Sequence, residues 1–220
     1  VISTAVATFV FFGVLMRPIA YLMLAFQGWI ESLAGGSLFI VGAVIGACMG
    51  FDMGGPINKT ASMAANALYA DMPEGIGGMA ETAKIIGGMT PAIGVGLSAI
   101  IAPKKFTRQQ KDAAYTCIPM GLCFITEGVL PFVAEDPLRI IPASMIGSAI
   151  ASGLAMTWGV VTPAAHGGIL VAPLSTNIGM WVLACAIGSV ITGVLYAVLK
   201  KMPSEDDNKE EEIVDLDIDL

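Results

Sequence analysis

Long uncharged runs of apolar and small residues alternate with short polar segments along most of the chain. The runs cover residues 1–16, 32–51, 85–103 and 140–199. A helix that crosses a lipid bilayer needs roughly 20 mostly apolar residues, and each run approaches or exceeds that length. The last run is long enough for two crossings, at 140–161 and 178–199, with irregular chain between them. The pattern predicts an all-α polytopic membrane protein whose transmembrane helices are joined by re-entrant hairpins and broken helices.

The segments between the runs give further predictions. Residues 1–30 are typical of one or two hydrophobic helices. Residues 60–70 are rich in small side chains and predict another helix. The segment 71–84 is the most polar stretch of the interior, which predicts a loop at the membrane surface. Pro91 predicts a break in the span 85–103, because proline removes a backbone hydrogen bond from a helix.

The composition supports a membrane protein. Hydrophobic residues make up 55% of the chain and charged residues 13%, with a mean hydropathy of +0.78, whereas a globular domain carries about a quarter charged residues. The net charge of −7 belongs mostly to the acidic end of the chain. We therefore divide the chain into a membrane domain, 1–201, and an acidic tail, 202–220, which we predict to be disordered. No basic face favours binding to nucleic acid.

The distribution of lysine and arginine predicts the orientation in the membrane. The densest basic segment, 104–111, is expected on the cytoplasmic side, and Lys200 and Lys201 place the C-terminus there too. An even number of crossings must then separate the two segments, and the run 140–199 supplies two. The segment 113–134 is therefore predicted as a re-entrant hairpin rather than as a full crossing.

Glu127 is the first candidate for function. It lies in an apolar segment and is followed by Gly128 and Pro131, which favour a broken helix. An ionised carboxylate at membrane depth costs several kcal/mol unless it is paired or faces a watery cavity, and irregular backbone is tolerated there only where it lines a protected site. These features predict that Glu127 is the centre of a substrate site. The alternative is a structural glutamate that accepts hydrogen bonds from backbone amides of the hairpin.

His166, the only histidine, is the second candidate. It lies in the irregular part of the run 140–199, between Pro163 and the pair Gly167 and Gly168. Imidazole donates and accepts hydrogen bonds and titrates near neutral pH, so His166 is a candidate for substrate contact or proton transfer; the alternative is a loop histidine that holds the break in shape. With no second histidine, and with cysteines spaced unlike a metal or redox motif, the sequence indicates no metal and no cofactor.

Two further clusters of polar residues accompany these candidates: Asp52, Asn58 and Lys59 in the first, and Glu135, Asp136 and Arg139 in the second. In the first cluster the aspartate and the lysine would neutralise each other, either as a structural ion pair at a helix break or beside a substrate, and the asparagine is the better candidate for contact with a substrate hydroxyl. In the second, the arginine lies three and four residues after the acids. That spacing predicts a salt bridge on one helical face at the end of the hairpin; the alternative is contact with a substrate.

Four blocks of sequence carry a resemblance to a known family. They are FDMGGPINKTA (51–61), GMTPAIGVGLSAIIAPKKFT (88–107), GLCFITEGVLPFVAEDPLRIIPASMIGSA (121–149) and TPAAHGGI (162–169). In wording and order they resemble the C-terminal part of the membrane IIC component of the fructose-family sugar phosphotransferase system. The resemblance covers nearly all of residues 1–201. Because the chain opens inside an apolar run without a methionine, we expect it to be a fragment that lacks an N-terminal part.

The resemblance implies group translocation in a bacterial inner membrane. A IIC component binds a fructose-like sugar near the middle of the bilayer, and a phosphocysteine on a IIB partner phosphorylates the sugar at the cytoplasmic face. Related IIC proteins hold the sugar hydroxyls with a glutamate in an Ile-Thr-Glu context, which corresponds here to Glu127 preceded by Thr126. Both residues are therefore expected to bind substrate. The resemblance also implies a homodimer.

Other functions remain open at this point. The chain has no cysteine followed by Pro-Thr-Gly, as a IIB domain has, and no phosphohistidine region of a IIA domain, so the phosphoryl donor must lie on a separate IIB partner. It also lacks the P-loop of an ATP-driven transporter. One alternative is an ion-coupled secondary sugar transporter in which Glu127 and His166 carry protons or ions. Another is a non-catalytic, truncated membrane component whose acidic tail is an interaction segment.

Overall fold

The computed structural model describes residues 37–203 and eight single positions before them. The helices predicted within 1–30 and the tail beyond residue 203 lie outside the described residues. Every regular element of the described part is helical. The elements are α3 (Leu38–Met49), α4 (Pro56–Asp71), α5 (Ile76–Ile101), α6 (Arg108–Leu122), α7 (Leu130–Glu135), α8 (Pro137–Thr157) and α9 (Ile178–Leu199), with the short 3-10 helices η3 (Pro103–Lys105), η4 (Thr126–Val129) and η5 (Gly168–Leu174).

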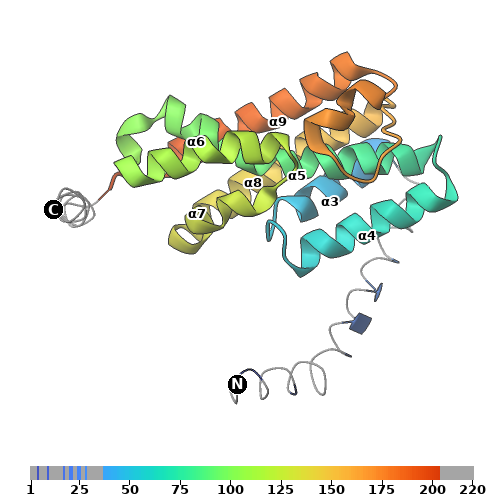
Figure 1. Cartoon of the computed structure of the whole chain (residues 1–220), viewed down its shortest axis with the longest axis horizontal. Helices are drawn as coiled ribbons and strands as arrows, with labels where there is room; N and C mark the ends of the chain where they lie inside the picture. The colour runs from blue at the N-terminus through green and yellow to red at the C-terminus, as the bar shows by residue number, and fades with distance from the viewer. Residues whose placement is uncertain are drawn as a thin grey trace.

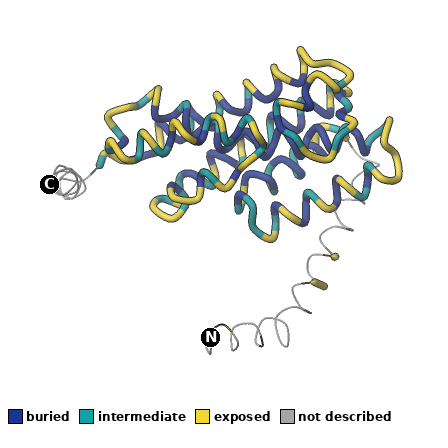
Figure 2. The backbone as a smooth tube through the Cα atoms, viewed as in Figure 1, coloured by how far each residue is buried: buried dark blue, intermediate teal, exposed yellow. Residues whose placement is uncertain are grey.

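Helix α5 lies at the centre of the described bundle (Figure 1). It packs against α3, α4, α6, α8 and α9, and most of its residues are buried (Figure 2). Its sequence is rich in glycine and alanine, small residues that let neighbouring helices approach closely on several sides. Elements that pack against α5 are therefore positioned relative to one another through it.

Three of the described helices, α5, α8 and α9, are long and apolar enough to cross a membrane. The shortest of them, α8, has 21 residues and extends roughly 30 Å, which is about the thickness of the hydrocarbon core. Helices α8 and α9 confirm two membrane-length helices at the positions predicted within 140–199. Helix α4 confirms the helix predicted at 60–70. Helix α3 has 12 residues and is shorter than the run 32–51 from which it comes.

The prediction of a surface loop at 71–84 is wrong for most of that segment. Only the four residues between α4 and α5 connect the two helices, because α5 already begins at Ile76. Its two charged side chains, Glu81 and Lys84, are buried. They pair with each other within the helix, and the pairing lets a polar sequence occupy the centre of the bundle.

The predicted break at Pro91 is also wrong, since α5 continues through it. Proline leaves the carbonyl of Gly87, four residues earlier, without its helical donor. The hydroxyl of Ser148 in α8 donates to that carbonyl at 2.8 Å instead. A neighbouring helix thus satisfies the group that the proline exposes, and α5 has no need to break.

Helices α3 and α8 pack closely through glycines of α3. Gly42, Gly46 and Gly50 are four residues apart, a spacing that predicts close helix contact in lipid. A Cβ atom on Gly50 would lie 2.7 Å from the carbonyl oxygen of Ser144, and one on Gly42 would lie 2.5 Å from that of Ser152. The two backbones are therefore in direct contact, as the spacing predicts.

Gly46→Val is expected to push α3 and α8 apart. A Cβ atom at this position would overlap the carbonyl oxygen of Ser148 and lie 2.5 Å from the Ser152 hydroxyl. Overpacking of this kind costs about 1–3 kcal/mol, which a lower melting temperature of the detergent-solubilised protein would report. Gly179→Ala is the control, because its Cβ would meet only Asn177 Oδ1, at an ordinary 3.5 Å. Equal melting temperatures for the two variants would contradict the close packing.

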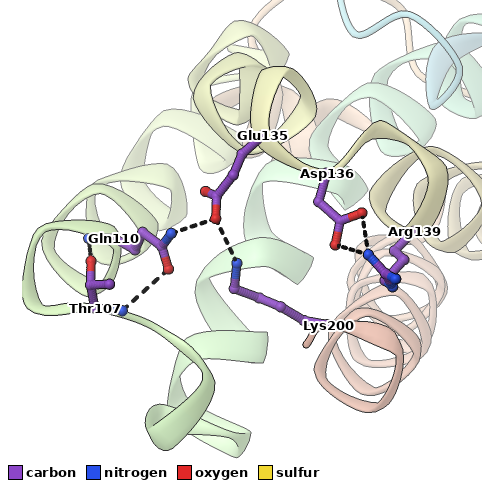
Figure 3. A network of polar contacts seen from close by, with 6 residues as sticks. All are labelled: Thr107, Gln110, Glu135, Asp136, Arg139 and Lys200. Atoms are coloured by element: carbon purple, nitrogen blue, oxygen red, sulfur yellow. Dashed lines mark hydrogen bonds and ion pairs between the residues drawn. The ribbon is translucent and has the colours of Figure 1, made fainter. Parts of the chain in front are cut away.

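Helices α6 and α7 form a hairpin whose two ends meet. Gln110 in the first turn of α6 donates to Glu135 Oε1 at the end of α7, at 2.6 Å (Figure 3). The ammonium of Lys200, just after α9, lies 3.4 Å from the same oxygen. The end of α7 therefore lies beside the start of α6 and beside the C-terminal end of α9.

The polar cluster at the hairpin end matches the prediction in part. Arg139 pairs with Asp136, with 2.7 Å between the guanidinium and Oδ1, whereas Glu135 pairs with Lys200 rather than with the arginine. Lys105 donates to two backbone carbonyls in the last turn of α9, each at 2.8 Å. The loop before α6, the end of α7 and the end of α9 thus lie together at one end of the bundle.

Candidate functional site

Glu127 lies in the tight turn η4 between α6 and α7. The chain enters this turn through Phe124, whose φ of +64° is uncommon for a residue with a side chain. The turn is fixed to α5, because the hydroxyl of Thr126 donates to the carbonyl of Gly88 at 2.8 Å. The Glu127 side chain is 48% exposed, so a rigid, irregular turn presents the carboxylate outside the packed helices.

The carboxylate of Glu127 lies beside the start of α4. Its Oε1 is 3.6 Å from the ammonium of Lys59, which makes the expected Asp52–Lys59 pair wrong. Gly54, with a φ of +112°, passes directly beneath the glutamate, and a Cβ on it would lie 2.7 Å from Oε1. Within the described part of the chain, no backbone amide is hydrogen-bonded to Glu127, so the structural alternative for this residue lacks the contacts it requires.

Asp52 and Asn58 bind the backbone around the start of α4. The carboxylate of Asp52 accepts hydrogen bonds from the amides of Ile57 and Asn58, at 2.7 and 2.9 Å, and so caps the helix. The Asn58 side chain donates to the carbonyl of Met49, the last residue of α3, at 2.8 Å. Both side chains thus fix the segment that carries Lys59 and faces Glu127.

His166 lies in the irregular chain between α8 and η5, as predicted. Its ring meets the ring of Phe124 edge to face, with 4.8 Å between the centroids. Gly168, with a φ of +58°, lets this loop press against the end of α6, where a Cβ would overlap the carbonyl oxygen of Leu122. His166 is exposed. Its ring contacts that of Phe124, which precedes Glu127 by three residues.

These segments converge on the middle of α5. The carbonyl of Gly88 accepts a hydrogen bond from the hydroxyl of Thr126. Gly88 also lies against the Phe124 ring, with which a Cβ atom on Gly88 would collide. A carboxylate and an imidazole are thus carried by two irregular segments that meet through one aromatic ring. Chemically the pair offers acceptors and a donor for neutral hydroxyl groups, and it offers two groups that exchange protons.

The buried pair of Glu81 and Lys84 was not among the residues predicted from the sequence. Lys84 is 1% exposed, and its ammonium contacts the Glu81 carboxylate, Asn66 Oδ1 at 2.7 Å and the carbonyl of Ala165 at 2.7 Å. The signal that could have revealed the pair is its three-residue spacing, which places opposite charges on one helical face. The polarity of the segment 71–84 predicts a loop instead, and residues three apart in a loop share no helical face.

Thr126→Val is expected to loosen the turn that carries Glu127. The substitution keeps the shape of the side chain but removes its hydrogen bond to the carbonyl of Gly88, at a cost of about 0.5–1.5 kcal/mol. The melting temperature should fall, and Thr126→Ser should restore it. If valine and serine give the same melting temperature, the hydrogen bond does not hold the turn.

Within the described residues, no group of three or more histidine, cysteine, aspartate or glutamate side chains could hold a metal ion. The four cysteines are free thiols.

Comparison with curated proteins finds several relatives. The chain is 39% identical over 199 residues to the fructose-specific EIIABC component of the PTS system of Bacillus subtilis (strain 168), which covers 88% of this chain and 31% of that protein. The fructose permease IIC component of Bacillus amyloliquefaciens matches at 39% identity, over 88% of this chain and 64% of that one. The fructose-specific EIIB'BC component of Rhodobacter capsulatus matches at 35%, over 93% and 36%.

The chain thus spans about a third of the two larger relatives and less than two thirds of the IIC component. No family model and no solved structure matches the chain.

Proposed function

Because the chain belongs to the family of fructose-specific IIC components of the sugar phosphotransferase system, we propose that it forms part of a permease that binds fructose or a fructose-like sugar and delivers it for phosphorylation. The observation that carries the proposal is the position of Glu127. Its half-exposed carboxylate stands on an irregular turn that is tied to the central helix by Thr126. Irregular backbone of this kind is found in membrane proteins where a polar substrate binds.

Glu127 and His166 are the main sugar contacts in this proposal. A carboxylate accepts hydrogen bonds from neighbouring hydroxyls, and such charge-assisted bonds are about twice as strong as neutral ones. The imidazole adds a donor or an acceptor. Three further side chains contribute to sugar binding through lone pairs that their present hydrogen bonds leave free: those of Thr126, Asp52 and Asn58. Their present hydrogen bonds hold backbone groups.

The phosphoryl donor is a separate IIB domain or subunit, a partner favoured by relatives whose names combine IIB with IIC. A sugar hydroxyl oxygen attacks the phosphorus of the IIB phosphocysteine, the S–P bond breaks as the O–P bond forms, and the hydroxyl proton passes to Glu127 or His166. Phosphoryl transfer asks little of a base, so the main contribution of the site is to hold the hydroxyl in line.

We propose a homodimer in a bacterial inner membrane, with a cytoplasmic C-terminus and a re-entrant α6–α7 hairpin. The position of the basic residues supports this orientation: Lys105 bonds the last turn of α9, and Lys200 contacts the end of α7. Cytoplasmic segments are enriched in lysine and arginine. The meeting of Gln110 with Glu135 supports a hairpin that enters and leaves on that same side.

The test uses the full-length permease in inside-out vesicles loaded with labelled fructose. Phosphorylated IIB is added outside, and fructose phosphate is measured there. We expect phosphorylated sugar to appear only when IIB carries phosphate. Free fructose that moves with an ion gradient would favour the secondary transporter, and the absence of sugar binding would favour the non-catalytic component.

A further inference from the structure

Lys84 connects three parts of the protein from a buried position. An ammonium group has three N–H donors, and the three contacts of Lys84 belong to three segments: Glu81 in α5, Asn66 in α4, and the carbonyl of Ala165 in the loop. Ala165 immediately precedes His166. We propose that Lys84 is a positioning residue that sets His166 relative to the Glu127 turn, and that Glu81 holds Lys84 in place for this purpose; the inference rests on the proposed function.

The loop before His166 and the turn that carries Glu127 form the two halves of the site, and both are fixed to the same face of α5. Lys84 holds the loop before His166, and Gly88, one helical turn further along, holds the Glu127 turn through Thr126. The rings of His166 and Phe124 join the two halves, with a centroid distance of 4.8 Å and an interplanar angle of 69°. The spacing between the two groups thus depends on two hydrogen bonds to a single rigid helix.

The rest of the loop is attached to α5 independently of Lys84. The amide of Thr162 donates to the carbonyl of Gly78 at 3.2 Å, and the hydroxyls of Thr162 and Thr82 are 2.8 Å apart. Loss of the Lys84 contact would leave these bonds in place. The expected effect is therefore local, a displacement of His166 rather than release of the whole loop.

Stability alone does not account for the pair. Replacing a buried ion pair with apolar residues of similar volume is often neutral or stabilising, because desolvating two charges is costly. An apolar residue cannot donate to the carbonyl of Ala165, however, and this donation is the contact that bears on His166. The geometry thus assigns the pair to positioning.

The test compares the intact permease with the double variant Glu81→Met/Lys84→Met. Removing both charges together avoids a lone buried carboxylate, and Glu81→Gln/Lys84→Gln serves as a second pair with polar side chains that are too short to reach Ala165. Lys105→Met is the matched control, since it also removes a lysine that holds backbone carbonyls, at the other end of the bundle. Two readouts are taken: the NMR signal of isotope-labelled His166, assigned by its loss in His166→Gln, and the KM and kcat for fructose with phosphorylated IIB.

We expect both double variants to shift the His166 signal and to raise KM about tenfold, with kcat within about twofold of wild type. A purely structural role would lower the amount of active protein without changing KM. The inference is overturned if the His166 signal stays at its wild-type position, or if KM is unchanged. The His166 signal needs no sugar, so failure of wild type to phosphorylate fructose would sink the proposed function and leave the positioning test intact.

Discussion

Glu127→Gln is expected to lower the rate of fructose phosphorylation by at least about 100-fold while the protein stays folded. Glutamine has the same shape but accepts hydrogen bonds as a neutral group, and each hydrogen bond to a charged group contributes about 1.5–3 kcal/mol. Two weakened bonds to the sugar correspond to about two powers of ten in rate. The side chain is half-exposed, so its charge is not needed for folding. The initial rate of fructose phosphate formation in inside-out vesicles measures the effect.

Lys59→Met separates sugar binding from the ion pair of Glu127. Lys59 is 60% exposed and lies 3.6 Å from the carboxylate, and exposed pairs of this kind contribute only about 0–1 kcal/mol. Its loss is expected to change the rate less than about fivefold. If Lys59→Met is as damaging as Glu127→Gln, the glutamate acts through its ion pair, and the assignment of sugar contact to it fails.

The membrane-spanning helices with uncharged sequences could be predicted from sequence. Helices α8 and α9 fall close to the predicted crossings because an apolar run of about 20 residues has few alternatives in a bilayer. The re-entrant hairpin at 113–134 follows from counting charges, since two basic segments on one side require an even number of crossings between them, and it stays a prediction.

The span at 85–103 could be predicted, but the earlier start of α5 and its continuity through Pro91 could not, because its irregular features are compensated by other segments. The charges of Glu81 and Lys84 cancel within the helix. The carbonyl of Gly87, which Pro91 leaves without its helical donor, is satisfied by Ser148, 61 positions further along the chain. The local sequence contains charged residues and a proline, and a proline ordinarily breaks or kinks a helix. The compensation depends on packing between helices, and sequence spacing does not report it.

The candidate site also contains residues that could be predicted from sequence and contacts that could not. Glu127 and His166 stand out because each is a polar residue beside glycine or proline in apolar sequence. The partner of Lys59 was misassigned, because Asp52 is near in sequence and Glu127 is near only in space. Asp52 instead accepts hydrogen bonds from backbone amides of α4. Residue types alone do not show whether an aspartate binds such amides or a nearby lysine.

Lys84→Met, made alone, is expected to prevent the permease from accumulating in its folded form. The substitution leaves the carboxylate of Glu81 buried without its cation. Removing one partner of a buried ion pair costs about 3–5 kcal/mol, a large share of a total stability of about 5–15 kcal/mol. The yield of monodisperse protein in detergent and its melting temperature report the loss.

The same measurement on Glu81→Met/Lys84→Met tests the cause of that loss. The double variant is expected to recover the yield and melting temperature of wild type, because no unpaired charge remains in the bundle. Lys105→Met should lower the melting temperature only slightly, since the carbonyls it leaves are at the end of α9 and no buried carboxylate faces it. If Lys84→Met proves as stable as the double variant, an unpaired buried carboxylate at Glu81 is not a source of instability in this bundle.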